Sequence, residues 1–241
     1  MIVFARVGAA LMVLPGIGDM TTPPQVRLLL ALGLTLAIAP ALTGSLPTAP
    51  AQPIALVTVI LTESTIGFFF GMLARLMVAA LEIAGMVIAQ QIGLANAFAL
   101  NPSMSAQGSI PGAILGTVGV LLLFATDMHH LLLRSLVQTY TLFPAGSPPP
   151  IGDMADTITR FAGHTFLVGV QLAAPFIVVG LVLFTGVGLL GRLMPQIQFF
   201  MIITPLQIGL GLLLFAATMS GVMLFWLSQF ESSLVGFLQN G

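Results

Sequence analysis

Two long uncharged runs constrain the fold of this chain more than any other feature. Residues 176–191 read "FIVVGLVLFTGVGLLG" and residues 208–227 read "IGLGLLLFAATMSGVMLFWL". In lipid, backbone polar groups must be satisfied within a helix or a closed barrel, and barrel strands alternate in polarity. These runs do not alternate, and only 5% of the 241 residues are charged. The sequence therefore predicts an all-α integral membrane protein.

Composition and motifs exclude several classes of function. The formal net charge is −1, so we expect no surface for nucleic acid. The chain has no cysteine, which excludes disulfides and thiolate chemistry. We find no phosphate-binding loop, nucleophile elbow or zinc-protease motif, and no convergent nucleophile and base. The sequence thus predicts neither an enzyme nor a cofactor. The N-terminus lacks the basic start of a signal peptide, so we expect it to belong to the mature fold.

The lengths of the apolar runs are irregular for simple membrane spans. Ile2–Ile17 and Val26–Leu42 are each shorter than the roughly 20 residues that a span needs. Ile54–Leu100 is too long for one span, since as a single helix it would reach about 70 Å. Ile158–Gly191 is expected to be broken or kinked at Pro175. We therefore expect helical hairpins with kinked and partial-span helices.

Three charges within the long run 54–100 are candidate functional groups. Glu63, Arg75 and Glu82 are costly at membrane depth. Arg75 and Glu82 are two helical turns apart on nearly one face, too far for close pairing. Two interpretations stay open: the charges pair with neighbouring helices, or they line a proton or ion pathway.

The same run carries a packing pattern. Gln90 and Gln91 are amides of the kind that bond to neighbouring helices in membranes. Small residues share their helix at Ala80, Ala84, Gly85 and Ala89. This pattern favours a helix embedded among other helices.

The only histidine cluster is "DMHH", Asp127 to His130. Adjacent histidines on a helix point about 100° apart, so we expect them not to chelate one metal well. We instead expect a polar break between two apolar runs, with Asp127 available to cap a helix.

Residues 192–207, "RLMPQIQFFMIITPLQ", lie between the two uncharged runs. From composition alone this segment is either a broken helix like those of secondary transporters or an unusually apolar loop. A stand-alone transporter or channel is therefore an alternative function, although we find no paired sequence repeat.

Several collinear stretches together resemble the FliR family of flagellar type III secretion export gates, whose injectisome counterpart is the SctT family. The matching stretches are "FARVGAALMVLPGIGD…PPQVRLLLALGLTLAIAP", "ESTIGFFFGMLARLMVAALEIAGMVIAQQIG", "NPSMSAQGS", "HHLLLRSLVQTYTLFPAG" and "GRLMPQIQFFMIITPLQIGLG". The second stretch has the family's E-x₃-G-x₃-G start, its AG pair and its Q-x-G. The fifth is close to the family's R-x-x-P-Q pattern. The match covers most of the chain, and "HHLLLRSL" favours the flagellar branch.

The resemblance implies a non-enzymatic gate subunit in the bacterial inner membrane at the flagellar basal body. Such a chain packs in a hetero-oligomeric assembly with FliP-like and FliQ-like subunits, together with FlhB-like and FlhA-like subunits, around a path for unfolded flagellar proteins. Residues 1–150 would form a FliP-like helical part with a central loop at 101–112. Residues 151–241 would form a FliQ-like C-terminal hairpin, joined near the proline-rich linker at 144–153.

The resemblance also implies two sets of site residues. A loop that plugs the pore would consist of Asn101, Pro102, Ser103, Met104, Ser105, Ala106, Gln107, Gly108, Ser109, Ile110 and Pro111. Polar or assembly positions within the membrane would be Arg6, Arg27, Glu63, Arg75, Glu82, Gln90, Gln91, Arg192, Pro195, Gln196, Gln198, Pro205 and Gln207. Among these, the glutamines of 192–207 would form hydrogen bonds between subunits in the turn of the C-terminal hairpin, and the two prolines would set its bends.

Overall fold

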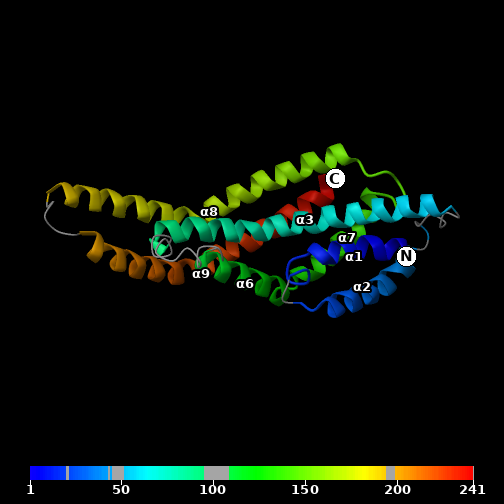
Figure 1. Ribbon diagram of the computed structural model, residues 1–241, viewed down its shortest axis with the longest axis horizontal. Helices are drawn as coiled ribbons and strands as arrows, with labels where there is room; N and C mark the ends of the chain where they lie inside the picture. Colours follow the sequence, from blue (N-terminus) through cyan, green and yellow to red (C-terminus); the bar gives the residue numbers. More distant parts are fainter. Residues whose placement is uncertain (20–21, 43, 45–51, 95–108, 194–198, 241) are drawn as a thin grey trace. The chain divides into compact units, whose positions relative to one another are not determined.

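The computed structural model describes residues 1–19, 22–42, 44, 52–94, 109–193 and 199–240 (Figure 1). Within these residues the chain is helical and contains no strand. The elements are α1 (Ile2–Val13), α2 (Pro24–Ile38), the 3₁₀ turn η1 (Ala39–Leu42), α3 (Pro53–Gln91), α6 (Ile110–Ala125), α7 (Met128–Leu142), α8 (Ile151–Leu193) and α9 (Phe199–Asn240). This architecture confirms the all-α fold.

The described residues include four helices that are long and apolar enough to cross a membrane. They are Pro24–Leu42, Pro53–Gln91, Ile151–Leu189 and Ile203–Gln239. The first of these corrects the expectation that the second apolar run is too short. Pro24 and Gln25 extend the helix at its start, where proline is well tolerated, and η1 continues it to 19 residues. Helix α1 is short, as predicted, with 12 residues.

Two long helices differ from the boundaries that the sequence suggested. Helix α3 ends at Gln91, and Gly93 has a φ of +79°, the conformation in which glycine commonly terminates helices. Helix α8 continues through Pro175, so of the two alternatives predicted there, a break or a kink, the break is wrong and the kink stays a prediction. Helices α6 and α7 meet at an angle of 77°, which agrees with the predicted polar break near Asp127.

The described chain divides into two compact units. Unit 1 comprises residues 1–78, 122–163 and 230–241, and unit 2 comprises residues 79–121 and 164–229. Each unit therefore draws on segments that are distant in sequence. These units are defined by contacts in space, whereas the predicted FliP-like part, residues 1–150, and FliQ-like part, residues 151–241, are defined along the sequence. That predicted division stays a prediction.

The core of unit 1 includes a cluster of aromatic rings from four segments. Phe69 of α3 packs edge-to-face with Phe143 at 6.2 Å between ring centroids. Phe237, near the end of α9, lies 6.1 Å from Phe69 and 6.4 Å from Phe161. Phe230, which is also buried, lies two turns before Phe237 on the same helix face. The C-terminal end of α9 is thus a core element of this unit.

The core of unit 2 contains the small-residue face of α3. Ala80, Ala84 and Ala89 are buried. A Cβ atom on Gly85 would overlap the backbone of Gly112 at the start of α6. The small residues therefore allow close packing with a helix of the same chain. Helices α8 and α9 also meet here, with Phe176 and Phe215 6.2 Å apart.

Candidate functional site

The site begins with the glycines of the motif E-x₃-G-x₃-G on α3. A Cβ atom on Gly67 would overlap the carbonyl oxygen of Arg6, and one on Gly71 would lie 2.9 Å from the carbonyl oxygen of Ala10. Glycines at this spacing let two helix backbones approach closely, so α1 packs directly on α3. Glu63 lies one turn before Gly67 on the same face of α3. This packing places the Glu63 carboxylate beside Arg6.

Arg6 and Glu63 form a fully buried ion pair. Arg6 Nε lies 2.7 Å from Glu63 Oε2, and both side chains have zero exposure. The second carboxylate oxygen, Oε1, accepts a hydrogen bond of 3.0 Å from the backbone N–H of Gly146. Gly146 has a φ of +82°, which glycine adopts without strain. Both oxygens of Glu63 therefore have partners.

The remaining guanidinium nitrogens of Arg6 bond to the C-terminal end of α7. Nη1 donates to the carbonyl of Thr139 at 3.1 Å, and Nη2 donates to the carbonyl of Phe143 at 3.0 Å. Carbonyls at a helix C-terminus have unused acceptor capacity and favour a cation. The Tyr140 ring adds a cation–π contact, with its centroid 3.9 Å from Arg6 Cζ. We call Arg6, Glu63, Thr139, Tyr140, Phe143 and Gly146 the Arg6 network.

The Arg6 network is a structural connection. It joins α1, α3, α7 and the start of the proline-rich linker within unit 1. Because Arg6 and Glu63 neutralise each other and are closed to water, the arrangement suits a rigid link between helices. Of the two interpretations open for Glu63, the geometry supports pairing. The partner is on the same chain.

The other candidate charges lie in more open surroundings. Arg75 forms an exposed ion pair with Asp19 at 3.4 Å. The guanidinium of Arg27 donates to the carbonyls of Thr22 and Asp19. Glu82 and Arg192 are exposed. Sequence spacing placed Arg75 and Glu82 on one face, but it gave no sign of Asp19 as the partner of Arg75.

A second polar contact lies in unit 2. Gln207 Nε2 donates a hydrogen bond of 2.8 Å to the carbonyl of Gln91, the last residue of α3. Gly93 lies against the same amide, since a Cβ atom there would be 3.4 Å from Gln207 Cδ. The Q-x-G motif, Gln91 to Gly93, therefore forms the end of α3 against which the Gln207 side chain packs and bonds. Gln90 is exposed.

The segment predicted as a turn, 192–207, is largely helical. Arg192 lies in the last turn of α8, and Pro205 lies inside α9, so only residues 194–198 separate the two helices. The apolar residues from Phe199 onward continue the long uncharged run that follows, which extends α9 toward its start. Pro195, Gln196 and Gln198 lie outside the described residues.

The predicted plug loop is only partly within the described residues. Asn101 to Gly108 lie outside them. Ile110 and Pro111 belong to the first turn of α6, which corrects the expectation that the loop extends past them. Ser109 precedes that helix, and its hydroxyl accepts the N–H of Gly112 at 3.0 Å, the bond of an N-cap. Proline in a first turn is favourable because its missing N–H would have no helical partner.

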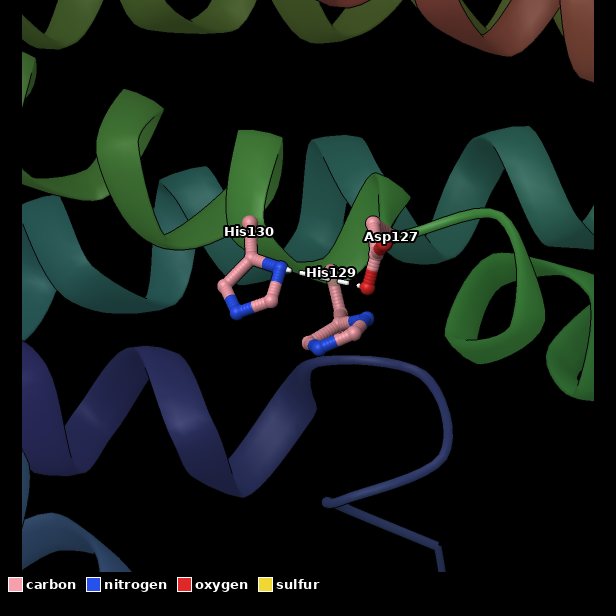
Figure 2. Close-up of side chains that lie close together, drawn as sticks. All are labelled: Asp127, His129 and His130. Carbon is pink, nitrogen blue, oxygen red and sulfur yellow. Dashed lines mark ion pairs between the residues drawn. The ribbon is translucent and has the colours of Figure 1, made fainter.

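Figure 2 shows Asp127, His129 and His130 gathered at the start of α7. One possible ligand atom from each lies within 4.8 Å of the others. The histidine rings are 4.1 Å apart, so the expectation that adjacent histidines diverge is wrong here. Asp127 occupies the N-cap position, but its side chain makes no capping bond and faces His130 at 3.4 Å. Three ligands would leave a tetrahedral site incomplete, with water at the fourth position.

Comparisons with known proteins agree with these motifs. Residues 1–233 match the family described as "Bacterial export proteins, family 1". The chain is 38% identical to the flagellar biosynthetic protein FliR of Caulobacter vibrioides over 233 residues, which cover 97% of this chain and 93% of the relative. It is 30% identical to FliR of Escherichia coli strain K12 over 89% of this chain and 81% of that protein.

A relative outside the flagellar proteins also matches. The Yop proteins translocation protein T of Yersinia pestis is 27% identical over 154 residues, which cover 63% of this chain and 59% of the relative. The flagellar relatives given above match over more of the chain at higher identity. The chain therefore belongs to the FliR family of bacterial export proteins, and it is a membrane-embedded subunit of a flagellar type III export apparatus.

Proposed function

We propose that this chain is a non-enzymatic subunit of the export gate in the bacterial inner membrane. In this role it packs with FliP-like and FliQ-like subunits, and with FlhB-like and FlhA-like subunits, around a path for unfolded flagellar proteins. It works by holding helices in place, without catalysing a reaction.

The observation that carries this proposal is the sparse burial of two membrane-length helices. Only 11% of the most apolar window of Pro24–Leu42 is buried within the chain, and the same fraction holds for Ile203–Gln239. Apolar faces of this extent require lipid or other subunits to cover them. A gate subunit surrounded by partners provides that cover.

The polar contacts support this role over that of a stand-alone transporter. Secondary transporters bind solutes at polar groups near the membrane midplane. In the described part of the chain, the buried charges Arg6 and Glu63 bond to each other. Gln207 likewise bonds to Gln91. These groups are engaged in holding helices together, which is the function of a scaffold.

The proposal divides the chain in two functional parts. Residues 1–150 act as a FliP-like part and residues 151–241 as a FliQ-like hairpin. Helices α8 and α9, joined by residues 194–198, support this hairpin, and Phe176 packs on Phe215 across it. Pro195 and Pro205 set the bends near the turn, while Gln196, Gln198 and Gln207 bond to neighbouring subunits. The bond to Gln91 uses one N–H of the Gln207 amide, and an amide has a second N–H and an oxygen that can also form hydrogen bonds.

Residues 101–109, which precede α6, are proposed to plug the pore in the closed gate. The segment "NPSMSAQGS" is neutral, so it can seal by packing and can move without breaking ion pairs. Deletion of residues 102–108 should raise ion permeability while the complex still assembles. An unchanged membrane potential in cells that carry the deletion would contradict the plug.

Purification in mild detergent tests the gate assignment. The tagged chain should copurify with FliP-like and FliQ-like subunits in a complex of defined mass. A lone monomer or homo-oligomer that moves a solute into vesicles would instead support the transporter. At single residues, Gln196→Leu combined with Gln198→Leu should impair assembly or export. Wild-type motility with an intact complex in this double variant would contradict the role of these amides.

A further inference from the structure

An apolar groove in unit 1 lies among α1, α2 and α3. Its volume is about 550 Å³, within the range of roughly 300–1,000 Å³ typical of small-molecule sites. Its lining includes Phe4, Gly8 and Met12 of α1, Leu28 and Ala31 of α2, and Phe68 of α3. Of the side chains that line it, only Arg27 and Ser64 are polar. The groove therefore suits a long apolar ligand with one polar end.

Arg27 provides a cation without a carboxylate partner. Its guanidinium donates to the carbonyl of Thr22 at 2.9 Å and to the carbonyl of Asp19 at 3.3 Å. The Asp19 carboxylate is engaged elsewhere, with the N–H of Gly16 at 2.9 Å and with Arg75 at 3.4 Å. Among the described residues, no acidic side chain forms an ion pair with Arg27. Its charge is left for a ligand to neutralise.

The position of Arg27 matches the boundary of a membrane. It lies in the first turn of α2, at the start of the candidate span Pro24–Leu42. Basic residues at the ends of spans face lipid headgroups, and basic pockets between membrane helices bind anionic headgroups. The N-terminus of α2 adds positive partial charge at the same end. From there the lining continues along α2 through Leu28 to Ala31.

We infer that this groove binds an anionic phospholipid, with its phosphate on Arg27 and one acyl chain between α1 and α2. A lipid carries the apolar chain and the anion in one molecule. A neighbouring helix would instead have to supply the carboxylate and the apolar surface from separate side chains. Gly8 leaves space for the chain, since the nearest atom to a Cβ built there is Phe4 Cζ at 3.9 Å. This inference does not depend on the gate role.

The test uses the full chain purified in detergent and titrated with phosphatidylglycerol or with phosphatidylcholine. Native mass spectrometry measures the bound lipid, and the melting temperature provides a second readout. Wild type should bind phosphatidylglycerol at least about tenfold more tightly than phosphatidylcholine, because the choline cation opposes Arg27. Equal binding of the two lipids, or no saturable binding, would overturn the inference.

Two variants and a control locate the site. Arg27→Gln should lower the affinity for phosphatidylglycerol about tenfold or more. Gly8→Leu fills the groove but keeps Arg27, and it should also abolish the saturable binding. Arg160→Gln removes an exposed charge from α8 outside the lining and should bind like wild type. The site would be contradicted if both groove variants bound phosphatidylglycerol like wild type. It would also be contradicted if Arg160→Gln lost as much affinity as the groove variants.

A photo-reactive residue at Ala31 distinguishes the occupant in cells. In the assembled apparatus it should crosslink mainly to phospholipid. Crosslinks mainly to another subunit would mean that a helix occupies the groove, and the lipid site would be rejected.

Discussion

The guanidinium of Arg6 lies 2.7 Å from the carboxylate of Glu63, and both side chains are inaccessible to solvent. The two residues are 57 positions apart in sequence. Arg6 also donates to the carbonyls of Thr139 and Phe143 and contacts the Tyr140 ring, and Glu63 also accepts from the N–H of Gly146. A buried pair of this kind adds little net stability when complete, but removal of one partner is expensive.

Glu63→Gln should destabilise the chain strongly. The substitution leaves the Arg6 charge buried without a counter-charge, which costs about 3–5 kcal/mol. The free energy of unfolding, measured in detergent by chemical denaturation, should fall by that amount. Export in cells should fall with the amount of folded chain.

Arg75→Gln is the matched control for this ion-pair variant. Its partner is Asp19, and the two side chains are 55% and 34% exposed. An exposed pair contributes about 0–1 kcal/mol, so the free energy of unfolding should change little. If Glu63→Gln and Arg75→Gln lowered the free energy of unfolding equally, burial would not determine how much the Arg6–Glu63 ion pair contributes to stability.

Gly67→Ala should separate α1 from α3. A Cβ atom at this position would overlap the carbonyl oxygen of Arg6, which is backbone and cannot rotate away. We expect a loss of about 1–3 kcal/mol from this overpacking. Gly33→Ala on α2 is the control, because no atom lies within 4 Å of a Cβ there. Alanine favours a helix over glycine by about 1 kcal/mol, so in detergent the control should melt at or above wild type.

The sequence was sufficient for the fold class and for part of the Arg6 network. Uncharged apolar runs leave only the helical solution in lipid, so the all-α fold followed directly. Glu63 stood out as a charge at membrane depth, whereas the packing role of the glycines in the E-x₃-G-x₃-G motif came only from the structure. The sequence did not identify Arg6 as the partner of Glu63, because Arg6 is on another helix and helical periodicity relates only residues of the same helix.

Helix ends were the least predictable feature. Residues 110–112 and 199–207 looked like loops because they contain or follow Pro and polar residues, yet they are helical. Proline is tolerated in a first turn, which explains Pro111. The Phe237 contact with Phe69 was also missed, since nothing in the sequence near the C-terminal end of α9 identifies which distant helix it packs against.

Gln207→Leu should destabilise unit 2 even in the isolated chain. It removes the donor to the carbonyl of Gln91, the last residue of α3. An unsatisfied carbonyl costs about 1–3 kcal/mol. Gln207→Glu should cost at least as much, since an ionised carboxylate has no hydrogen to donate.

Gln138→Leu provides the control for this amide, because Gln138 is exposed on α7. Thermal unfolding in detergent should distinguish it clearly from Gln207→Leu. If both variants melt like wild type while the assembled complex is weakened by Gln207→Leu alone, the amide acts between subunits and its bond to Gln91 contributes little.

At Asp127 the backbone conformation favours glycine, whereas the side-chain contact favours aspartate. Its φ is +59°, a left-handed value that costs most L-residues about 1–2 kcal/mol and costs glycine almost nothing. Its carboxylate lies 3.4 Å from His130, but the side chains are 77% and 62% exposed. An exposed contact of this kind contributes little. The backbone should therefore decide the outcome of a substitution.

Two substitutions at this position separate the effects. Both Asp127→Gly and Asp127→Ala remove the carboxylate, but only glycine accepts the left-handed conformation freely. The glycine variant should equal or exceed wild type in the free energy of unfolding, and the alanine variant should be less stable than the glycine variant by about 1 kcal/mol. His130→Ala, which keeps Asp127, should change stability by less than about 0.5 kcal/mol. Equal losses in all three variants would instead mean that the contact between Asp127 and His130 holds the bend between α6 and α7, since the carboxylate–imidazole pair is the one feature that all three remove.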